Sequence, residues 1–257
     1  LIILTFNLQR NSIFQKKDYI FGTIVDIKIY GESKELASEA SKEILLNFRQ
    51  LHKLLHPWRK GLMYEINEAI YNQTPFLIDD QEVISLIQRG QEYEKKTRGY
   101  FNPAIGKLVN LWGFHSEVPR NVMPATKDIL ELVEAKPSMV NIKIINNELS
   151  STNNFVQIDM GGYAKGFALD QAKKILEQYK IKNALINIGG NIMALGMQGN
   201  KEWIVGIQDP RNPNLMATIP LKPGWSIGTS GDYQKYFTVN GKRYSHIINP
   251  YTGYPVS

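Results

Sequence analysis

The sequence contains no cysteine, and this absence removes several classes of site at once. Disulfides, thiolate nucleophiles and zinc or iron–sulfur centres with cysteine ligands are excluded. The chain also lacks dense Lys/Arg blocks and arrays that interleave basic with aromatic residues, so its net charge of +6 does not indicate a nucleic-acid partner. We interpret the charge mainly as solvated faces, with an anionic ligand or a membrane surface as the alternatives. A Walker A loop, a G-x-G-x-x-G fingerprint, a nucleophile elbow and an H-E-x-x-H helix are absent as well.

What is present is the composition of an ordinary soluble globular protein. The 257 residues are 43% hydrophobic and 21% charged, which allows a sizeable core in one domain or in two closely fused lobes. The N-terminal run LIILTFNL is too short, and too polar at Thr5 and Asn7, to cross a bilayer. The run is either the trimmed remnant of an export signal or an edge strand. We expect residues 1–18 to precede the domain, as the remnant of an export signal, and the domain to span 19–257.

Hydrophobic periodicity predicts a fold that mixes helices and strands. Apolar residues at three- and four-residue steps predict helices at 33–55, 81–96, 127–134 and 164–179. Alternating apolar residues predict strands at 24–29, 140–150 and 154–160, and the chain is strand-rich from 184 onward. Asp79 or Asp80 is expected to cap the second helix, and the Asn240-Gly241 pair predicts a type I′ hairpin. These elements favour an α+β fold with a mainly antiparallel sheet and packed helices.

The stretch IDMGGYAKGFALD, residues 158–170, joins a predicted strand to the last predicted helix. Gly161 and Gly162 permit a close approach of the backbone, the first N–H groups of a helix lack helical partners, and Lys165 adds a positive charge. Such a turn stabilises a bound anion. The same residues also suit a plain strand-to-helix turn that needs small side chains, and the stretch alone does not decide between the two.

Two later segments carry polar groups. The segment IGTSGDY places Thr229, Ser230 and Asp232 together, where hydroxyls and backbone donors either bind phosphate oxygens or form a hydrogen-bonded turn. His246 ends a hairpin strand and precedes the turn-dense NPYTGYP. It is a candidate for proton transfer or phosphate contact, against the commoner role of a satisfied structural histidine.

Taken together and in order, seven segments closely resemble the FAD:protein FMN transferases, the ApbE-type flavin transferases. The segments are FGT at Phe21–Thr23, GYFNPAIGKLVNLWGF, IDMGGYAKGFALD, NALINIGGNIMALG, WIVGIQDP, TSGDY and GKRYSHIINPYTGYPV. The resemblance covers about Tyr19 to Val256, nearly the whole chain. It implies the T-fold-like α+β arrangement of that family, in agreement with the predicted elements.

The resemblance also implies an activity, which is magnesium-dependent transfer of FMN from FAD to a threonine hydroxyl of an acceptor flavoprotein, with release of AMP. Family members are typically exported, often lipid-anchored, proteins facing the bacterial periplasm, so we expect a periplasmic protein anchored to the inner membrane. Their acceptors are subunits of membrane redox complexes. Two alternatives stay open: an FAD pyrophosphatase that yields FMN and AMP, and a non-catalytic flavin-binding protein.

Roles for individual residues follow from the same resemblance. The candidate catalytic residues are Asp159, Lys165 and His246, with Lys165 neutralising phosphate charge and either Asp159 or His246 taking the proton of the acceptor hydroxyl. The backbone carbonyl of Ala164 is the expected Mg²⁺ ligand. The residues expected to contact the flavin nucleotide are Phe21, Gly22, Thr23, Tyr100, Phe101, Asn102, Gly161, Lys165, Phe167, Thr229, Ser230 and Ile248.

The sequence departs from the family pattern at several points. Asn102 and Asn249 stand where the family usually has Asp, so a metal or sugar contact at either position is expected to be neutral. The usual Ser-Glu pair after the first helix is present only in part, as Tyr64-Glu65. The family continues past TGYPV into a strand and a helix whose Asp and Thr complete the metal site. The sequence given ends before them, and we therefore expect weak metal affinity for this chain.

Overall fold

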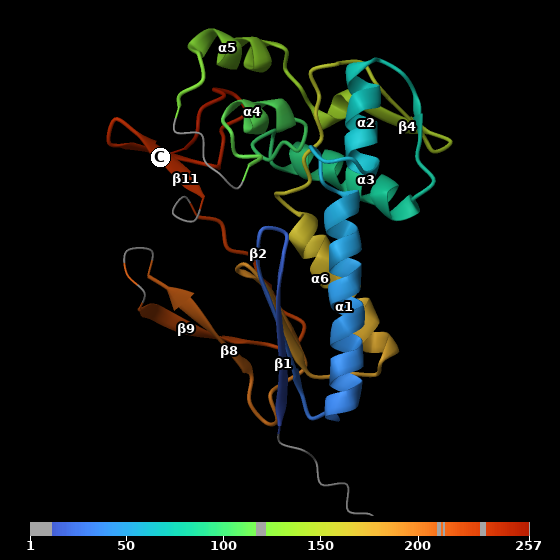
Figure 1. Cartoon of the computed structure of the whole chain (residues 1–257), viewed down its shortest axis with the longest axis vertical. Helices are drawn as coiled ribbons and strands as arrows, with labels where there is room; N and C mark the ends of the chain where they lie inside the picture. Colours follow the sequence, from blue (N-terminus) through green and yellow to red (C-terminus); the bar gives the residue numbers. More distant parts are fainter. Residues whose placement is uncertain (1–11, 117–121, 210–211, 213, 232–234, 257) are drawn as a thin grey trace, which may run out of the picture. The chain divides into compact units, whose positions relative to one another are not determined.

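The structure is a computed structural model that describes residues 12–116, 122–209, 212, 214–231 and 235–256. The chain divides into two compact units. Unit 1 contains the described residues up to His52 together with Lys165–Ser230, and unit 2 contains Lys53–Ala164 together with the described residues from Gly231 onward. Each unit therefore combines two stretches that are far apart in the sequence, as the colours of Figure 1 show.

Unit 1 is built on a five-stranded antiparallel sheet with the strand order β1-β2-β6-β7-β10. Its strands are β1 (Ile13–Ile20), β2 (Thr23–Tyr30), β6 (Ala184–Ile188), β7 (Asn191–Leu195) and β10 (Ser226–Ile227). Helices α1 (Lys34–Leu54) and α6 (Ala164–Gln178) pack along one face of this sheet (Figure 1). A separate antiparallel hairpin consists of β8 (Trp203–Gln208) and β9 (Leu215–Leu221).

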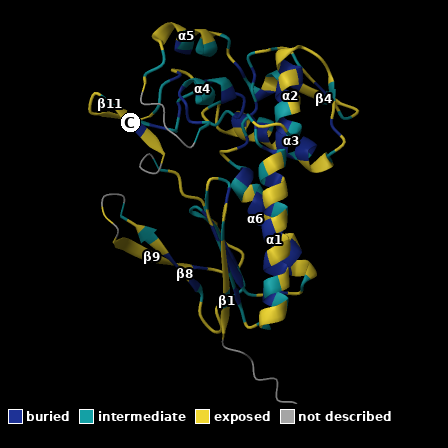
Figure 2. Ribbon diagram, in the orientation of Figure 1, coloured by how far each residue is buried: buried dark blue, intermediate teal, exposed yellow. Residues whose placement is uncertain are grey.

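Matching apolar faces explain why these elements pack together. In β2 every second residue is buried, namely Val25, Ile27 and Ile29, and these pair with Ile188, Ile186 and Ala184 of β6. Helix α1 supplies a buried stripe at three- and four-residue spacing, formed by Ala37, Ala40, Ile44, Phe48 and Leu51. The period of two in the strands and of about 3.6 in the helix thus places both apolar sets in one core. Figure 2 shows this separation of buried and exposed sides along α1.

The opposite face of the sheet is covered by the β8–β9 hairpin. A second hydrophobic cluster joins the two, formed by Leu185, Ile192, Ala194, Trp203, Val205 and Leu221. The Trp203 indole is buried and donates a hydrogen bond of 3.3 Å from Nε1 to the Leu195 carbonyl. Unit 1 is therefore a sheet with helices on one face and a hairpin on the other.

Unit 2 combines short helices with small antiparallel sheets. Its helices are α2 (Leu62–Tyr71), α3 (Gln81–Lys96), α4 (Gly106–Leu111), α5 (Thr126–Glu134) and the 3-10 helix η1 (Met139–Asn141). Its strands are β3 (Phe76–Leu77), β4 (Ile142–Ile145), β5 (Glu148–Ser151), β11 (Tyr236–Val239) and β12 (Lys242–Ser245), arranged as a β3-β5-β4 sheet and a β11–β12 hairpin. The Trp112 ring is fully buried, stacks at 5.6 Å on the Tyr244 ring and donates from Nε1 to the Gly253 carbonyl at 2.7 Å. This side chain joins the end of α4 to the hairpin and to the turn that follows it.

The predicted fold class is confirmed, since helices combine with sheets whose strand ladders are all antiparallel among the described residues. The four predicted helices correspond to α1, α3, α5 and α6. Asp80 caps α3, accepting the Glu82 and Val83 N–H groups at 2.9 and 3.1 Å. The predicted type I′ hairpin is present, with φ of 49° at Asn240 and 75° at Gly241.

Some elements differ from the sequence prediction. Residues 154–160 form no strand, because a parallel bridge between Gln157 and Ile105 is their one β contact. Helix α2 was not predicted, and it begins after Gly61 without a side-chain cap, so the usual start signal is missing. Strand β1 begins at Ile13 and thus includes the last residues of the segment 1–18. The positions before residue 12 lie outside the described residues.

Candidate functional site

The turn between β1 and β2 places the first predicted ligand contacts. Ile20 pairs with Thr23, so Phe21 and Gly22 are the two central residues, and their φ angles of 59° and 69° define a type I′ turn. A phenylalanine in the left-handed region is unfavourable because its Cβ crowds the backbone. The Phe21 ring offsets this by packing on α1, with its centroid 5.8 Å from the Phe48 ring.

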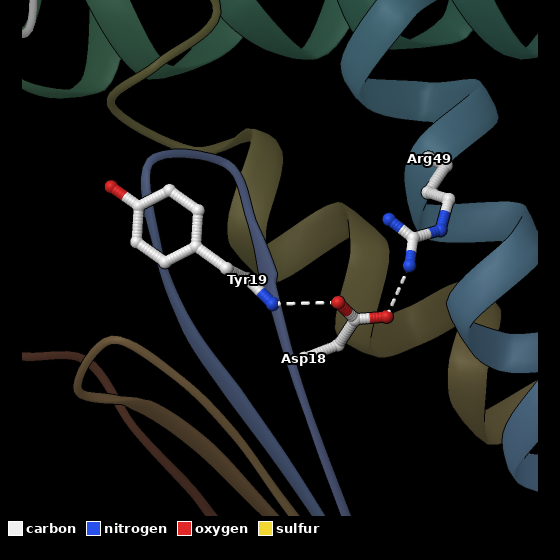
Figure 3. A network of polar contacts seen from close by, with 3 residues as sticks. All are labelled: Asp18, Tyr19 and Arg49. Atoms are coloured by element: carbon white, nitrogen blue, oxygen red, sulfur yellow. Dashed lines mark hydrogen bonds and ion pairs between the residues drawn. The ribbon is translucent and has the colours of Figure 1, made fainter.

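An ion pair fastens β1 to the same helix just before this turn (Figure 3). Asp18 accepts a hydrogen bond from Nη2 of Arg49 in α1 through one carboxylate oxygen, and through the other it accepts the Tyr19 N–H at 2.8 Å. The Tyr19 ring points away from this contact. The strand end that leads into the Phe21 turn is thus held on α1 by a charged contact as well as by the Phe21 ring.

A glycine turn between β6 and β7 lies against two further predicted contacts. Gly189 and Gly190 have φ angles of 55° and 92°. A Cβ at Gly189 would lie 2.3 Å from Oγ1 of Thr23, and a Cβ at Gly190 would lie 3.2 Å from Cβ of Thr229. Only glycine fits here, so unit 1 brings Thr23 and Thr229 to the same turn. The pair lies in the INIGGN part of a recognised motif, but the sequence reasoning assigned it no role.

The remaining predicted residues of unit 1 are Ser230, Lys165 and Phe167. Ser230 directly follows Thr229 and is exposed, whereas Asp232 lies outside the described residues. Lys165 and Phe167 are half-buried in the first turn of α6. Burial lowers the pKa of the Lys165 ammonium group, because desolvation disfavours the charged form. A bound anion near this group would favour the charged form again.

Unit 2 holds the turn that precedes α6. The Gly161 N–H donates to Oδ1 of Asp159 at 2.9 Å, and a Cβ at Gly162 would lie 2.9 Å from Cε2 of Phe101. The second glycine is therefore required by the close approach of the Phe101 ring. Phe101 also packs edge-on against Tyr163, with ring centroids 5.6 Å apart, and this contact ties the predicted loop at 100–102 to the turn.

The Asp159 carboxyl is an unusual acid in this turn. Desolvation by the surrounding protein raises its pKa above the ordinary value, while the Gly161 N–H and the positive charge of Lys235 act in the opposite direction. The backbone of the same residue donates to the Pro103 carbonyl at 2.8 Å. Asp159 is thus held from both its backbone and its side chain, and its proton leaves less readily than that of an exposed aspartate.

In the loop at 100–102 the Tyr100 ring is exposed, whereas the Asn102 amide makes hydrogen bonds through both its nitrogen and its oxygen. Tyr100 is 67% exposed and meets the Tyr251 ring edge-on at 5.3 Å. Asn102 donates from Nδ2 to the Pro137 carbonyl and accepts the Ala104 N–H at Oδ1, both at 2.8 Å. Tyr100 therefore has surface to offer a ligand, whereas the Asn102 side chain already serves the backbone of unit 2.

His246 is oriented by a residue that the sequence reasoning missed. The Lys235 carbonyl lies 3.0 Å from the backbone nitrogen of His246 and 3.1 Å from its ring Nδ1. The Lys235 ammonium donates to the Phe114 carbonyl. Nearby, Ile248 is 8% exposed within the core cluster around Trp112, so its predicted ligand contact stays a prediction. No sequence motif marks Lys235, because its contribution here comes from the backbone carbonyl.

The described residues do not complete a magnesium site. Mg²⁺ prefers near-octahedral oxygen ligands, usually with one or two carboxylates. No group of three or more His, Asp or Glu side chains in the described part of the chain is placed to hold a metal ion. Ala164, the expected carbonyl ligand, is the buried first residue of α6, and the carboxylate nearest to it in sequence is that of Asp159. This donor set is too small for the metal.

Comparison with known proteins agrees with the predicted resemblance. A family model described as the ApbE family matches residues 21–257. The FAD:protein FMN transferase of Rhodobacter capsulatus is 34% identical over 238 residues, which are 93% of this chain and 45% of that protein. The chain thus spans less than half the length of this relative.

Two solved structures have a similar fold. The ApbE protein from Thermotoga maritima has a TM-score of 0.86 at 30% identity, covering 95% of this chain and 78% of that one. The flavin transferase ApbE from Vibrio cholerae has a TM-score of 0.80 at 25% identity, covering 96% and 79%. Both matches extend over nearly all of the present chain.

Proposed function

The chain belongs to the ApbE family, and from this premise we propose that it transfers FMN from FAD to a threonine hydroxyl of an acceptor flavoprotein, with release of AMP. Two features of the chain support the proposal. The first is the glycine turn that leads into α6, which suits a pyrophosphate. The second, which carries the proposal, is the way the Lys235 carbonyl holds the ring of His246.

The contact with Lys235 selects one tautomer of His246. A carbonyl oxygen can only accept a hydrogen bond, so Nδ1 at 3.1 Å must carry the proton in this contact. In the neutral ring Nε2 then keeps its lone pair and acts as a base. The Phe114 ring packs edge-on against the imidazole at a centroid distance of 6.5 Å and further limits its orientation. We therefore assign the proton-accepting role to Nε2 of His246.

Asp159, the other candidate base, suits a positioning role better. One of its oxygens already accepts the Gly161 N–H, and its raised pKa shows that the surroundings disfavour the carboxylate. A carboxyl in this state holds the glycine turn in place whether or not it is ionised, since a protonated acid retains an acceptor oxygen. The chemical step then needs one base, His246, rather than two.

The proposed reaction is a phosphoryl transfer in a single displacement. The acceptor hydroxyl oxygen attacks the phosphorus of the FMN half of FAD, and a new P–O bond forms. The bond from this phosphorus to the bridging pyrophosphate oxygen breaks, so that AMP leaves with that oxygen. The hydroxyl proton passes to Nε2 of His246. Lys165 and the positive end of the α6 helix dipole would offset the negative charge of the transferred phosphate.

The test is an incubation of the protein with FAD, Mg²⁺ and a domain that carries a flavinylation threonine, followed by denaturing electrophoresis. A fluorescent acceptor band is the expected result. Free FMN and AMP without a labelled band would identify an FAD pyrophosphatase instead. Bound but unchanged FAD would identify a flavin-binding protein without catalysis. Either outcome overturns transfer as the function of this chain.

A variant of the proposed base sharpens this test. His246→Gln keeps a side chain of similar size but removes the base, so we expect transfer to fall by about 100-fold. FAD binding should stay within about threefold, because the imidazole acts on the acceptor proton rather than on the flavin. Equal losses in binding and transfer would instead make His246 a ligand contact.

Magnesium dependence belongs to the proposal as an expectation from family membership. Mg²⁺ would supply Lewis-acid stabilisation of the phosphate oxygens when bound. The same assay in EDTA checks it, and full activity in EDTA would remove the metal from the proposal.

We also propose a periplasmic location at the inner membrane and an acceptor within a membrane redox complex. Family membership supports both. Separately, none of the helices in the described ranges is long and apolar enough to cross a membrane. Fractionation of cells that express the natural protein tests the location. Recovery with cytoplasmic markers would overturn it.

A further inference from the structure

Asn67, in the unpredicted helix α2, makes two hydrogen bonds to a single residue far along the chain. Its Oδ1 accepts the Ile158 N–H at 2.7 Å, and its Nδ2 donates to the Ile158 carbonyl at 3.0 Å. The side chain is 5% exposed and Ile158 is fully buried. One amide therefore satisfies both backbone groups of the residue immediately before Asp159, as a neighbouring strand would.

The other side of this segment is held by backbone contacts. The Gln157 N–H donates to the Ala104 carbonyl at 3.1 Å, and the Asp159 N–H donates to the Pro103 carbonyl at 2.8 Å. Gln157 and Asp159 thus bind loop backbone on one side, and Ile158 between them binds the Asn67 side chain on the other. Residues 157–159 are thus extended and paired on both sides without belonging to a sheet, which explains why the predicted strand is absent.

We propose that Asn67 is a positioning residue for FAD binding, setting the place of the Asp159–Gly162 turn through Ile158. The inference rests on the proposed function. Both backbone groups of Ile158 bind this one side chain, and the next residues are Asp159, which accepts the Gly161 N–H, and the two glycines that lead into α6. A shift of Ile158 would move this turn and the start of α6, where the proposed function places the phosphates of FAD.

The amide is required because the contact needs one donor and one acceptor on the same group. Aspartate has the same shape but offers only acceptors when ionised, so Asn67→Asp would place an oxygen against the Ile158 carbonyl. The N–H contact would survive while the carbonyl contact would become repulsive. The segment would then keep only one of its two hydrogen bonds to residue 67, although its own sequence is unchanged.

The chain offers a matched control in Asn153. Its Nδ2 donates to the Ala135 carbonyl at 2.8 Å and its Oδ1 accepts the Phe155 N–H at 2.9 Å. Asn153→Asp therefore makes the same chemical change to a backbone clamp in the same unit. It differs in that the clamped segments are not joined directly to the glycine turn.

The experiment measures the Kd for FAD by flavin fluorescence titration in the wild type, Asn67→Asp and Asn153→Asp, with the melting temperature of each. We expect Asn67→Asp to raise Kd at least tenfold and Asn153→Asp to change it less than twofold, although both lower the melting temperature. A merely structural role would reduce the folded fraction without changing the Kd of the folded molecules. If Asn67→Asp does not fold, Asn67→Ser, whose hydroxyl can make at most one of the two contacts at a time, should raise Kd at least threefold.

Each result decides the matter. An unchanged Kd in the folded Asn67 variant, or equal increases in both aspartate variants, would overturn the positioning role while leaving the proposed function intact. A wild-type protein that does not bind FAD would overturn the proposed function, and this inference with it. A Kd increase confined to the Asn67 variants supports the inference.

Discussion

The Asn102 side-chain amide donates a hydrogen bond of 2.8 Å to the Pro137 carbonyl. Its oxygen accepts the Ala104 N–H at the same distance, so both ends of the side chain bind backbone. An aspartate could accept from Ala104, but it could not donate to Pro137. Asn102 therefore gives this chain a link between two loops of unit 2 that an aspartate at the same position would not make.

This link predicts different outcomes at Asn102 and Asn249, the two positions where the sequence analysis expects aspartate in the family. Asn102→Asp should lower the free energy of unfolding by about 1–3 kcal/mol, because the Pro137 carbonyl loses its donor. Asn249→Asp should be near neutral, because Asn249 uses its oxygen to accept the Tyr251 N–H at 2.9 Å and a carboxylate can do the same. Urea denaturation of both variants checks this, and equal losses would contradict it.

The close approach of Thr23 to Gly189 in the β6–β7 turn gives a second prediction. Gly189→Ala should be less stable than Gly224→Ala by about 1–3 kcal/mol, the usual penalty for overpacking. Both glycines have positive φ, at 55° and 81°, but a Cβ at Gly224 meets nothing within 4 Å. The difference between the two variants thus isolates the clash with Thr23 from the cost of placing an alanine at positive φ.

A double variant tests whether Thr23 causes the difference. Thr23→Ala removes Oγ1 and Cγ2, which lie 2.3 and 2.8 Å from the position that a Cβ at residue 189 would occupy. Gly189→Ala should then be less harmful in the Thr23→Ala background than in the wild type. Additive losses measured by denaturation would show that Thr23 is not the obstacle.

Backbone strain at Phe21 gives a third prediction. Once the ring is removed, Phe21→Gly should be more stable than Phe21→Ala by about 1 kcal/mol, since φ is 59° and only alanine carries a Cβ. The reverse order is expected at Lys42, an exposed site inside α1, where glycine is worse than alanine by about 1 kcal/mol. Thermal or urea unfolding of the four variants provides the measurement. If glycine and alanine rank in the same order of stability at both positions, backbone strain at Phe21 is excluded as the cause.

The raised pKa of Asp159 gives a fourth prediction, on pH dependence. Unfolded aspartate titrates near 3.8, so between that pH and the raised folded value the folded state keeps a proton that the unfolded chain releases. The free energy of unfolding of the wild type therefore falls as pH rises through this window. Asp159→Asn has no such proton, so its stability relative to the wild type should increase with pH.

Denaturation at several pH values measures this relative stability, with Asp79→Asn, at an exposed aspartate, as the control. The asparagine oxygen can still accept the Gly161 N–H, which keeps the turn comparable in the two proteins. A difference between Asp159→Asn and wild type that stays flat, or decreases with pH, would show that the buried carboxyl is not held protonated.

Strong periodicity and local chemistry made much of the fold predictable. Helices α1 and α3 follow from apolar stripes and from the Asp80 cap, and the β11–β12 hairpin follows from Asn240-Gly241. Helix α2 could not be found in this way, because no side chain caps its start. Residues 154–160 have strand-like alternation, yet their partners are loop backbone and one asparagine side chain, which no local pattern reveals.

The candidate site was predictable only where its chemistry lies in side chains. Lys165 and His246 stand out in the sequence because a charge and an imidazole are recognisable residue types. The contribution of Lys235 to His246 lies in a backbone carbonyl, which every residue possesses. Asn67 likewise acts on a residue remote in sequence, so only the folded chain relates it to the glycine turn.

The strand order of unit 1 has a consequence for how the protein is made. Strand β2 pairs on one side with β1 and on the other with β6, which is synthesised only after the first stretch of unit 2. Until β6 has been synthesised, the β2 edge of the β1–β2 hairpin therefore stays unpaired and can pair with a wrong strand. A hairpin alone is also only marginally stable. Pairing between such distant segments is slow. The arrival of β6 should thus set the rate at which the nascent chain becomes protease-resistant, and the β2 edge is the surface that a chaperone would have to shield until then.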